Sequence, residues 1–446
     1  MIFKIKKMGN NMKIGIVGLG FVGLSLTSVL SSKGYNVVGI DIDKEKCNKI
    51  CNGVLPFFEP DLEKILKKGL KKKLAISNDF SLIKDCDMIF VTVGTPQKSN
   101  GSIELSMIKK AVAAIGRVLV KSKKNPVIFI KSTVIPGTLQ NIILPILEKK
   151  SGRKAGRDFG LLSNPEFLQE SSAIKDTKNP HAIVLGGYQT KYMKKAKNFF
   201  SNLNPNVPII ITNHQTAELI KYANNSFLAT KISFVNQLAN ICQNIPGANI
   251  DDVARTIGLD PRIGKLFLNA GPGYGGSCLP KDVKAIMNFS SKIGVSPLFF
   301  NAVEKTNQQQ IELIIKLIEK NCGNLTGKNI SILGLAFKPK TEDIRDSTSL
   351  KLIEKLLRKQ VKVSVHDPMA IENVRKKFKN KIKYTNSISD VLKDSSCGVI
   401  MTAWPEYSKI TNRDIKNMKK RIIIDSQRIL NNTKLDCVYN AIGIGN

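Results

Sequence analysis

"MKIGIVGLGFVGLSLTSVLSSKGYNVVGIDID" (12–43) is the stretch that decides the fold of the N-terminal part of the chain. An apolar strand leads into the pattern Gly18-x-Gly20-x-x-Gly23. An apolar helical segment follows, and a second strand ends at Asp41. Such glycines allow a tight turn and the close approach of a pyrophosphate to the start of the helix, while the acidic residue accepts hydrogen bonds from a ribose. The segment predicts a dinucleotide-binding turn, and the alternative is an α/β turn that binds no nucleotide.

The same stretch imitates a targeting segment, because Ile14 to Leu30 is uncharged and follows several lysines. Its three glycines and the lack of a small-residue cleavage site favour a strand, a turn and a helix instead. No other uncharged apolar run approaches the roughly 20 residues of a membrane span. We expect residues 1–11 to be a disordered basic tag before a start at Met12.

Further apolar strands alternate with helical patterns, which predicts a parallel, doubly wound sheet. In such sheets ligands bind beyond the carboxyl ends of the strands. Thr95, Thr133 and Glu166 each follow a predicted strand, so we expect them to line one crevice. The stretches that contain these strands and the loops that end them are "DMIFVTVGTP" (87–96), "PVIFIKSTVIPGT" (126–138), "FGLLSNPEFL" (159–168) and "HAIVLGG" (181–187).

A long helix and a second α/β region follow. Residues 215–243 have helical apolar spacing without glycine or proline, and Lys221 and Asn225 lie one turn apart on one face of that helix. Near residue 325 strands resume. This second region resembles the first, but it lacks the full glycine pattern. The expected fold is therefore α/β, with two Rossmann-like doubly wound domains joined by a long central helix. The predicted boundaries are 12–212, 213–324 and 325–446.

"AGPGYGGSCLPKD" (270–282) places one thiol, Cys278, on a glycine-rich loop with Lys281 and Asp282 behind it. A structural cysteine is usually buried on a helix or strand. A thiol beside a nicotinamide suggests capture of an aldehyde, removal of a hydride and hydrolysis of a thioester. The glycines would let a substrate approach the backbone. The alternative is a merely structural loop cysteine.

The composition limits other functions. The chain has 446 residues and 42% apolar residues, enough for two or three domains. Its eight cysteines are mostly scattered, which fits a reducing cytoplasm better than a disulfide framework. Three histidines, none with metal-site spacing, predict no metal centre. The net charge of +34 allows nucleic-acid binding as an alternative, but the lysines are dispersed, and a basic surface also attracts an anionic small substrate.

Several motifs together resemble the UDP-glucose/GDP-mannose dehydrogenase family from Met12 to about Leu430. The matching motifs are "GIVGLGFVGL", "EPDL", "VTVGTP", "KSTVIPGT", "NPEFLQE", "AELIKYANNSFLATKISFVNQ", "DPRIG", "GPGYGGSCLPKD" and "GLAFKPKTEDIRDS". The chain departs from the family pattern at "LQES", "PHA" and "DSQRIL", none of which removes a catalytic residue.

The resemblance implies NAD as the cofactor and specific roles for residues. Cys278 would be the nucleophile and Glu166 the base in thioester hydrolysis. Lys221, Asn225 and Asp282 would polarise the sugar oxygen, stabilise oxyanions and order water, and Thr133 would position water. The cofactor-binding positions are Gly18, Gly20, Gly23, Asp41, Lys46, Thr95, Thr133, Glu170 and Arg345. The substrate-binding positions are Phe167, Leu168, Glu170, Lys221, Asn225, Arg262, Tyr274, Gly275, Lys338 and Arg428.

The resemblance further implies oxidation of a sugar C6 alcohol twice, with two NAD+, to a uronic acid. The motifs favour UDP-glucose as the substrate, with UDP-N-acetylmannosamine, UDP-N-acetylglucosamine and GDP-mannose as alternatives. Arg262 would reach a neighbouring subunit's site in a homodimer or larger assembly. An NAD-dependent hydroxyacid dehydrogenase is a further alternative, but it leaves Cys278 and the C-terminal domain without a role.

Overall fold

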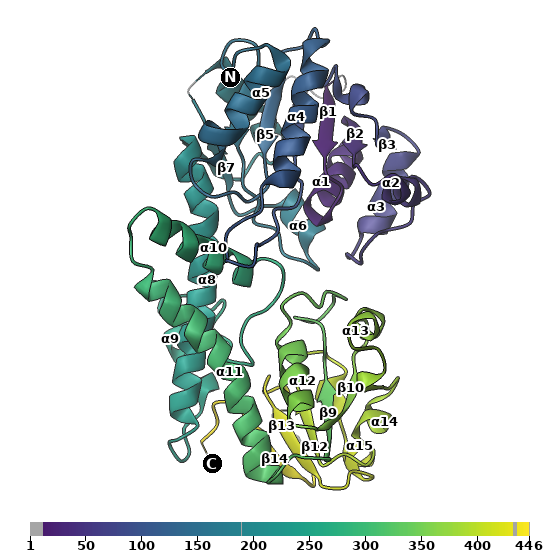
Figure 1. Cartoon of the computed structure of the whole chain (residues 1–446), viewed down its shortest axis with the longest axis vertical. Helices are drawn as coiled ribbons and strands as arrows, with labels where there is room; N and C mark the ends of the chain where they lie inside the picture. Colours follow the sequence, from purple (N-terminus) through teal and green to yellow (C-terminus); the bar gives the residue numbers. More distant parts are fainter. Residues whose placement is uncertain (1–11, 189, 431–434, 446) are drawn as a thin grey trace, which may run out of the picture. The chain divides into compact units, whose positions relative to one another are not determined.

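The structure is a computed structural model that describes residues 12–188, 190–430 and 435–445 (Figure 1). The expectation for residues 1–11 lies outside the described residues. The chain divides into two compact units, residues 1–223 and 224–446. Helix α8 (His214–Cys242) contributes residues to both, and it matches the long helix expected at 215–243. The predicted boundaries of three domains stay a prediction.

The first unit is built on an eight-stranded sheet. All neighbouring strands are parallel except β6 and β7, which meet in an antiparallel contact at Ser163 and Gly186. The sequence predicted a parallel sheet, and this contact is the exception. The edge strand β8, with the apolar sequence Ile-Ile-Ile-Thr, is only half-buried, and the sequence interpretation did not include it. In sheet order, the strands are β3 (Leu74–Ser77), β2 (Asn36–Ile40), β1 (Lys13–Val17), β4 (Met88–Val91), β5 (Val127–Ile130), β6 (Gly160–Ser163), β7 (Ile183–Gly186) and β8 (Ile209–Thr212).

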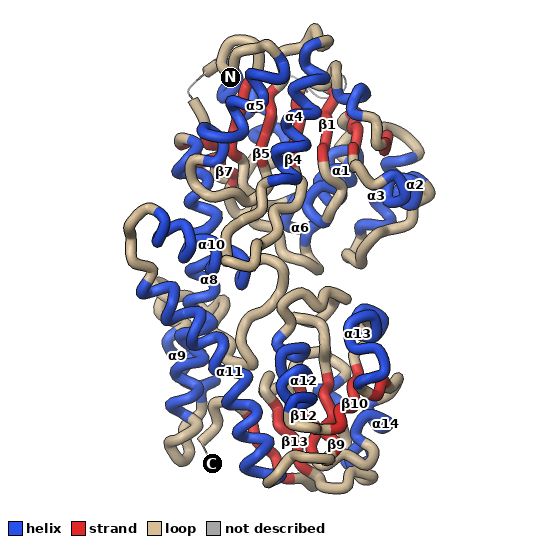
Figure 2. The backbone as a smooth tube through the Cα atoms, in the orientation of Figure 1, coloured by secondary structure: helices blue, strands red, loops and turns tan. Residues whose placement is uncertain are grey.

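The central strands are apolar on both faces because the sheet is covered on both sides. Along β4, Met88 and Phe90 enter one hydrophobic core, while Ile89 and Val91 enter the other. The first core takes side chains from α1 (Phe21–Ser32), α3 (Leu62–Leu70), α6 (Ala173–Lys178) and α7 (Lys191–Leu203). The second takes them from α4 (Ser106–Val120), α5 (Leu144–Ser151) and the π-helix η2 (Leu139–Ile143). The double winding predicted from the sequence is confirmed (Figure 2).

One or two helical segments lie between successive strands of the first unit. They are α1 (Phe21–Ser32), α2 (Lys44–Cys51), α3 (Leu62–Leu70), η1 (Phe80–Ile83), α4 (Ser106–Val120), η2 (Leu139–Ile143), α5 (Leu144–Ser151), α6 (Ala173–Lys178) and α7 (Lys191–Leu203).

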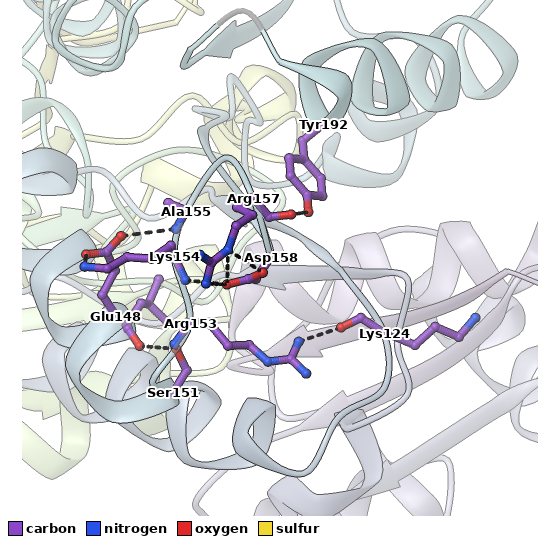
Figure 3. A network of polar contacts seen from close by, with 10 residues as sticks. Lys124, Glu148, Ser151, Arg153, Lys154, Ala155, Arg157, Asp158 and Tyr192 are labelled. Atoms are coloured by element: carbon purple, nitrogen blue, oxygen red, sulfur yellow. Dashed lines mark hydrogen bonds and ion pairs between the residues drawn. The ribbon is translucent and has the colours of Figure 1, made fainter.

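Polar contacts fix the turn between α5 and β6 (Figure 3). Glu148 pairs with Lys154 at 2.9 Å, and Asp158 accepts the Lys154 backbone N–H at 2.8 Å and pairs with Arg157 at 2.9 Å. The hydrogen bond from Arg157 and the Lys154 N–H lower the pKa of Asp158 to about 2. The Tyr192 hydroxyl donates to the Arg157 carbonyl at 2.7 Å, so α7 is tied to the same turn.

The second unit carries a fully parallel six-stranded sheet with the same order of its first strands as the first unit. In sheet order, the strands are β11 (Lys383–Tyr384), β10 (Lys362–His366), β9 (Asn329–Leu333), β12 (Cys397–Ile400), β13 (Ile422–Asp425) and β14 (Val438–Ala441). The helical segments are α9 (Ile250–Ile257), α10 (Leu279–Lys292), α11 (Leu298–Cys322), α12 (Thr348–Arg358), α13 (Ile371–Phe378), η3 (Lys379–Lys381), α14 (Ile388–Leu392), η4 (Tyr407–Lys409) and α15 (Asn412–Ile415).

The second sheet repeats one structural device of the first. Gly334 follows β9 with a positive φ of 94°, as Gly18 follows β1 with a φ of 98°. Asp367 follows β10 and accepts the Leu335 N–H at 2.7 Å, but it also accepts the indole N–H of Trp404 at 3.1 Å. The indole contact distinguishes Asp367 from Asp41, whose donors are Leu19, Asp43 and Lys46.

No helix within residues 12–188, 190–430 and 435–445 is long and apolar enough to cross a membrane. The region from Ile14 to Leu30 forms β1, the glycine turn and most of α1, as the strand–turn–helix interpretation predicted.

Candidate active site

The glycine turn after β1 has the shape that a dinucleotide requires. A side chain at Gly23 would overlap the Gly18 carbonyl oxygen at 1.8 Å, and one at Gly18 would lie 2.9 Å from the Val93 nitrogen. These two glycines are therefore required by the packing of the protein itself. A side chain at Gly20 would meet nothing within 4 Å, so the space beside the start of α1 is open. An open cradle at a helix N-terminus fits a pyrophosphate.

Asp41 stands at the end of β2, where the sequence predicted a ribose acceptor. It is buried, and its carboxylate accepts the Leu19 N–H at 2.8 Å and the Asp43 N–H at 3.1 Å. Lys46, from α2, pairs with it at 2.7 Å. Burial alone would raise the pKa of Asp41, but the hydrogen bonds from Lys46 and Leu19 outweigh it and lower the pKa. The carboxylate therefore stays ionised and able to accept a hydrogen bond.

The loops after β4 and β5 bring together Thr95 and Thr133, two of the three residues expected to line one crevice. The Thr95 hydroxyl donates to the Thr133 carbonyl at 2.8 Å. Ser132 donates to the Val93 carbonyl at 2.7 Å, so the loop after β5 is attached to the loop after β4.

Glu166 and Lys221 form a buried ion pair within the first unit. Their side chains are 10% and 5% exposed, and the ammonium nitrogen lies 3.1 Å from a carboxylate oxygen. Glu166 also accepts the Leu168 N–H at 2.5 Å, which fixes the loop after β6. The Lys221 ammonium lies 5.4 Å from the centre of the Phe167 ring. The residues predicted for proton transfer and oxyanion stabilisation are therefore in direct contact.

Cys278 lies at the N-cap of α10 and is exposed. The Ser277 hydroxyl lies 3.5 Å from its sulfur. A helix N-terminus favours a thiolate, because the helix dipole and the free N–H groups stabilise negative charge. The thiol is not buried in a core, and its catalytic role stays a prediction.

Asp282 and Asn225 form a buried polar pair in the second unit. Asp282 is buried one turn beyond Cys278, and its carboxylate accepts the Asn225 side-chain N–H at 2.6 Å. Lys281 pairs with the other carboxylate oxygen at 2.5 Å. This network orients the Asn225 amide and ties α8 to the helix that carries the thiol.

The glycines before Cys278 are explained by contacts inside the protein. Side chains added at Gly273, Gly275 and Gly276 would lie 2.5 to 2.7 Å from Asn307, Asp346 and Phe337, respectively. The sequence interpretation gave these glycines to substrate approach. The structure adds that the loop must pack closely against α11 and the loop after β9.

The remaining predicted residues have varied surroundings. Tyr274 is buried, and its hydroxyl donates to Glu304 at 3.2 Å. Burial raises the pKa of this phenol, and Glu304 adds to the effect. Arg428, with a positive φ of 53°, is buried and donates to Asp251 and to the Ala270 carbonyl, both at 2.8 Å. Arg428 thus holds the start of the cysteine loop.

Three predicted cations lie in loops. Arg262 pairs with Asp260 at 2.6 Å and Arg345 with Asp343 at 2.5 Å. The Lys338 ammonium lies 5.7 Å from the centre of the Phe337 ring. Glu170 is half-buried in the loop after β6. Their roles toward cofactor or substrate stay predictions.

The sequence interpretation missed two buried acids and one half-buried lysine. Lys131 donates to Asn164, Glu218 accepts N–H groups from the loop after β5, and Glu59 accepts those of Ser171 and Ala173. A charged residue at the end of an apolar strand, as in "VIFIKST", was the signal that could have identified Lys131. Among the described residues, no group of His, Cys, Asp and Glu is arranged to hold a metal ion.

A glycine cradle at the start of α1, with an ionised carboxylate at the end of β2, defines a dinucleotide-binding protein of the kind found in NAD-dependent oxidoreductases. Family models match three consecutive parts of the chain: the NAD binding domain of the UDP-glucose/GDP-mannose dehydrogenase family at 12–204, its central domain at 215–309 and its UDP binding domain at 331–432. The chain belongs to the UDP-glucose/GDP-mannose dehydrogenase family, and it is an NAD-dependent dehydrogenase.

Relatives of similar length support this assignment. The chain is 37% identical to the UDP-glucose 6-dehydrogenase of Haloferax volcanii, over 94% of this chain and 97% of the relative. It is 38% identical to that of Rickettsia conorii, over 97% and 99%. The UDP-glucose dehydrogenase structure from Pyrobaculum islandicum is similar with a TM-score of 0.91 and 31% identity, covering 98% of this chain and 99% of that one. A UDP-N-acetylmannosamine dehydrogenase structure from Pyrococcus horikoshii gives 0.85 and 26%, covering 97% and 99%.

Proposed function

We propose that the protein oxidises the C6 alcohol of UDP-glucose in two steps to the carboxylate of UDP-glucuronate. The observation that carries this proposal is the exposed thiol of Cys278 at the start of α10, with the Asn225–Asp282 pair behind it. A dehydrogenase that makes only an aldehyde or ketone needs no such nucleophile. The relatives named as UDP-glucose 6-dehydrogenases support UDP-glucose as the sugar nucleotide.

The first oxidation requires transfer of the alcohol proton to water and stabilisation of the oxygen as negative charge develops. Lys221, a buried ammonium, is suited to stabilise that oxygen, and Asn225, one turn further on α8, adds a side chain fixed by Asp282. When bound, NAD accepts one hydride in each of the two oxidations.

The second oxidation uses the thiol. The Cys278 sulfur adds to the aldehyde carbon and holds it as a thiohemiacetal, whose oxidation leaves a thioester. Glu166 acts as the base that takes a proton from the hydrolytic water, and Thr133 positions that water. Cleavage of the carbon–sulfur bond returns the thiol and releases the uronic acid.

The ligand contacts proposed for both nucleotides follow from the family resemblance. Gly18, Gly20, Gly23, Asp41, Lys46, Thr95, Thr133, Glu170 and Arg345 are proposed for the cofactor. Phe167, Leu168, Glu170, Lys221, Asn225, Arg262, Tyr274, Gly275, Lys338 and Arg428 are proposed for the sugar nucleotide.

The test is an assay of NADH formation with UDP-glucose, UDP-N-acetylglucosamine, UDP-N-acetylmannosamine, UDP-galactose and GDP-mannose. UDP-glucose is expected to turn over best and to yield two NADH per sugar. One NADH per sugar contradicts the thioester route. If UDP-glucose is not oxidised while another member of the panel is, UDP-glucose is not the substrate. The proposed two-step oxidation would not be contradicted by that result.

A homodimer is proposed from an apolar stripe on α8. Phe227, Phe234 and Ile241, one heptad apart, are 64%, 53% and 49% exposed. Large apolar side chains at heptad spacing mark a helix that packs on a partner. Light scattering should give twice the mass of one chain for the wild type and the mass of one chain for Phe234→Glu. A monomeric wild type refutes the stripe as an interface.

A catalytic thiol also suits a reducing compartment, so the cytoplasm is the proposed location.

A further inference from the structure

Lys131 is a cation at the end of the apolar strand β5 that the proposed mechanism does not use. Its ammonium donates to the side-chain oxygen of Asn164 at 3.0 Å and to the Asn164 carbonyl at 3.3 Å. Asn164 is buried just beyond β6, and its own N–H group donates to the Val184 carbonyl at 2.9 Å. Lys131 therefore ties the end of β5 to the strand end that carries Glu166.

Lys131 and Glu166 also line one small cavity of the first unit, together with Asn164 and Phe167. The other carboxylate lining this cavity, Asp176 of α6, accepts hydrogen bonds from the Gln169 N–H at 2.9 Å and the Ser172 hydroxyl at 2.8 Å, and so it is already occupied.

Two cations lie near Glu166: Lys131, which lines the cavity with it, and Lys221, which pairs with it. Lys221 contacts Glu166 directly from α8, whereas Lys131, just after β5, lines the same cavity as this carboxylate. Burial lowers the pKa of Lys131 to about 8, with Glu166 opposing this shift and Lys221 contributing to it. An ammonium in this position can lose its proton near physiological pH, which an exposed lysine does not do.

We propose that Lys131 is a positioning residue that holds Glu166 in place and ionised, and that it releases a proton to solvent when Glu166 takes one. The inference rests on the proposed role of Glu166 in thioester hydrolysis. It deepens that function by assigning a destination to the proton.

Each proton that moves during hydrolysis has a donor and an acceptor. A water O–H bond breaks as its oxygen bonds to the thioester carbon, and Glu166 takes the proton. The carbon–sulfur bond breaks, and the thiolate of Cys278 takes the proton of the new carboxylic acid. Lys131 loses a proton to solvent, so Glu166, Lys131 and Lys221 together keep their net charge of +1. Glu166 then passes its proton to the neutral amine of Lys131, which restores the starting state with one proton released.

The test compares Lys131→Met, Lys131→Arg and the wild type from pH 6.5 to 9.5, with UDP-glucose and NAD+. Because Lys131 must be protonated at the start, the wild-type kcat should fall above about pH 8. In Lys131→Met, kcat should fall about 10- to 100-fold, near the lower end of the effect of general acid–base catalysis, with little change in KM. This variant should also accumulate a covalent adduct on Cys278 in intact-protein mass spectrometry.

Lys131→Arg separates charge from proton release, because a guanidinium stays protonated. It should keep more activity than Lys131→Met and should lose the decline above pH 8. It also decides the question if Lys131→Met fails to fold. Lys175→Met, at an exposed lysine of α6, is the matched control and should behave as the wild type.

An unchanged alkaline decline in both Lys131 variants overturns the proposal, as does a raised KM with an unchanged kcat. These results differ from a failure of the proposed function, in which the wild type itself would form no acid from any sugar nucleotide.

Discussion

Glu218 gives a quantitative test of how the first unit is held together. This α8 residue is 2% exposed, and its two carboxylate oxygens accept the backbone N–H groups of Gly137 at 2.6 Å and Leu139 at 2.8 Å. These groups begin the helical segment after the Thr133 loop. Burial raises the pKa of Glu218 from 4.5 to about 7, and the two hydrogen bonds only partly oppose it.

The sign of the effect follows from proton binding. Between pH 4.5 and pH 7 the folded protein keeps a proton on Glu218 that the unfolded chain has lost, so the free energy of unfolding falls as the pH rises. The difference between about 7 and 4.5, at about 1.4 kcal/mol for each pH unit, amounts to about 3 kcal/mol. Most of this loss lies between pH 5 and pH 8.

Glu218→Gln removes the titration and keeps the size of the side chain. The free energy of unfolding of the wild type minus that of the variant should therefore drop by about 3 kcal/mol from pH 4.5 to pH 8. Urea unfolding followed by hydrogen-exchange mass spectrometry on peptides of the first unit measures this difference. Fluorescence of Trp404, the single tryptophan, follows the second unit separately.

The matched control is Glu63→Gln, at an exposed carboxylate of α3 that pairs with Lys67. Its effect should stay within about 1 kcal/mol at every pH, as for other surface ion pairs. A constant difference between the wild type and Glu218→Gln across the pH range would refute the reasoning, because it would mean that the two N–H groups fully offset the cost of burial.

Two further predictions concern the proposed chemistry. Cys278→Ser should lower steady-state formation of the acid by about 10³-fold or more, because a serine hydroxyl is a far weaker nucleophile at neutral pH, and NADH production measures it; full activity in this variant would exclude the thiol mechanism. The wild type should use NAD+ with a catalytic efficiency on the order of 10²-fold above that with NADP+, because the ionised, buried Asp41 repels a 2′-phosphate even with Lys46 beside it, and Asp41→Asn should narrow this preference. Equal efficiency of the wild type with both cofactors would show that Asp41 does not contact the ribose.

Local patterns in the sequence were enough for the elements that build the fold. The strand, the Gly18 turn, the following helix and Asp41 lie within 12–43, and hydrogen bonds and sterics over a few residues decide such a unit. The apolar strands before Thr95 and Glu166 were predicted for the same reason, because burial on both faces leaves a continuous apolar run. Cys278 was identified because a thiol on so many glycines departs from the usual place of a cysteine.

Only the tertiary structure decided which distant residues meet. The order β5–β6 in the sheet places Lys131 beside Asn164, which is 33 residues away, and α8 brings Glu218 to Gly137 across 81 residues. The reversal of β7 against β6 also depends on this packing. Periodicity reports whether a residue is buried, but the partner of a buried charge is chosen by sheet order and helix packing, which depend on the whole chain at once.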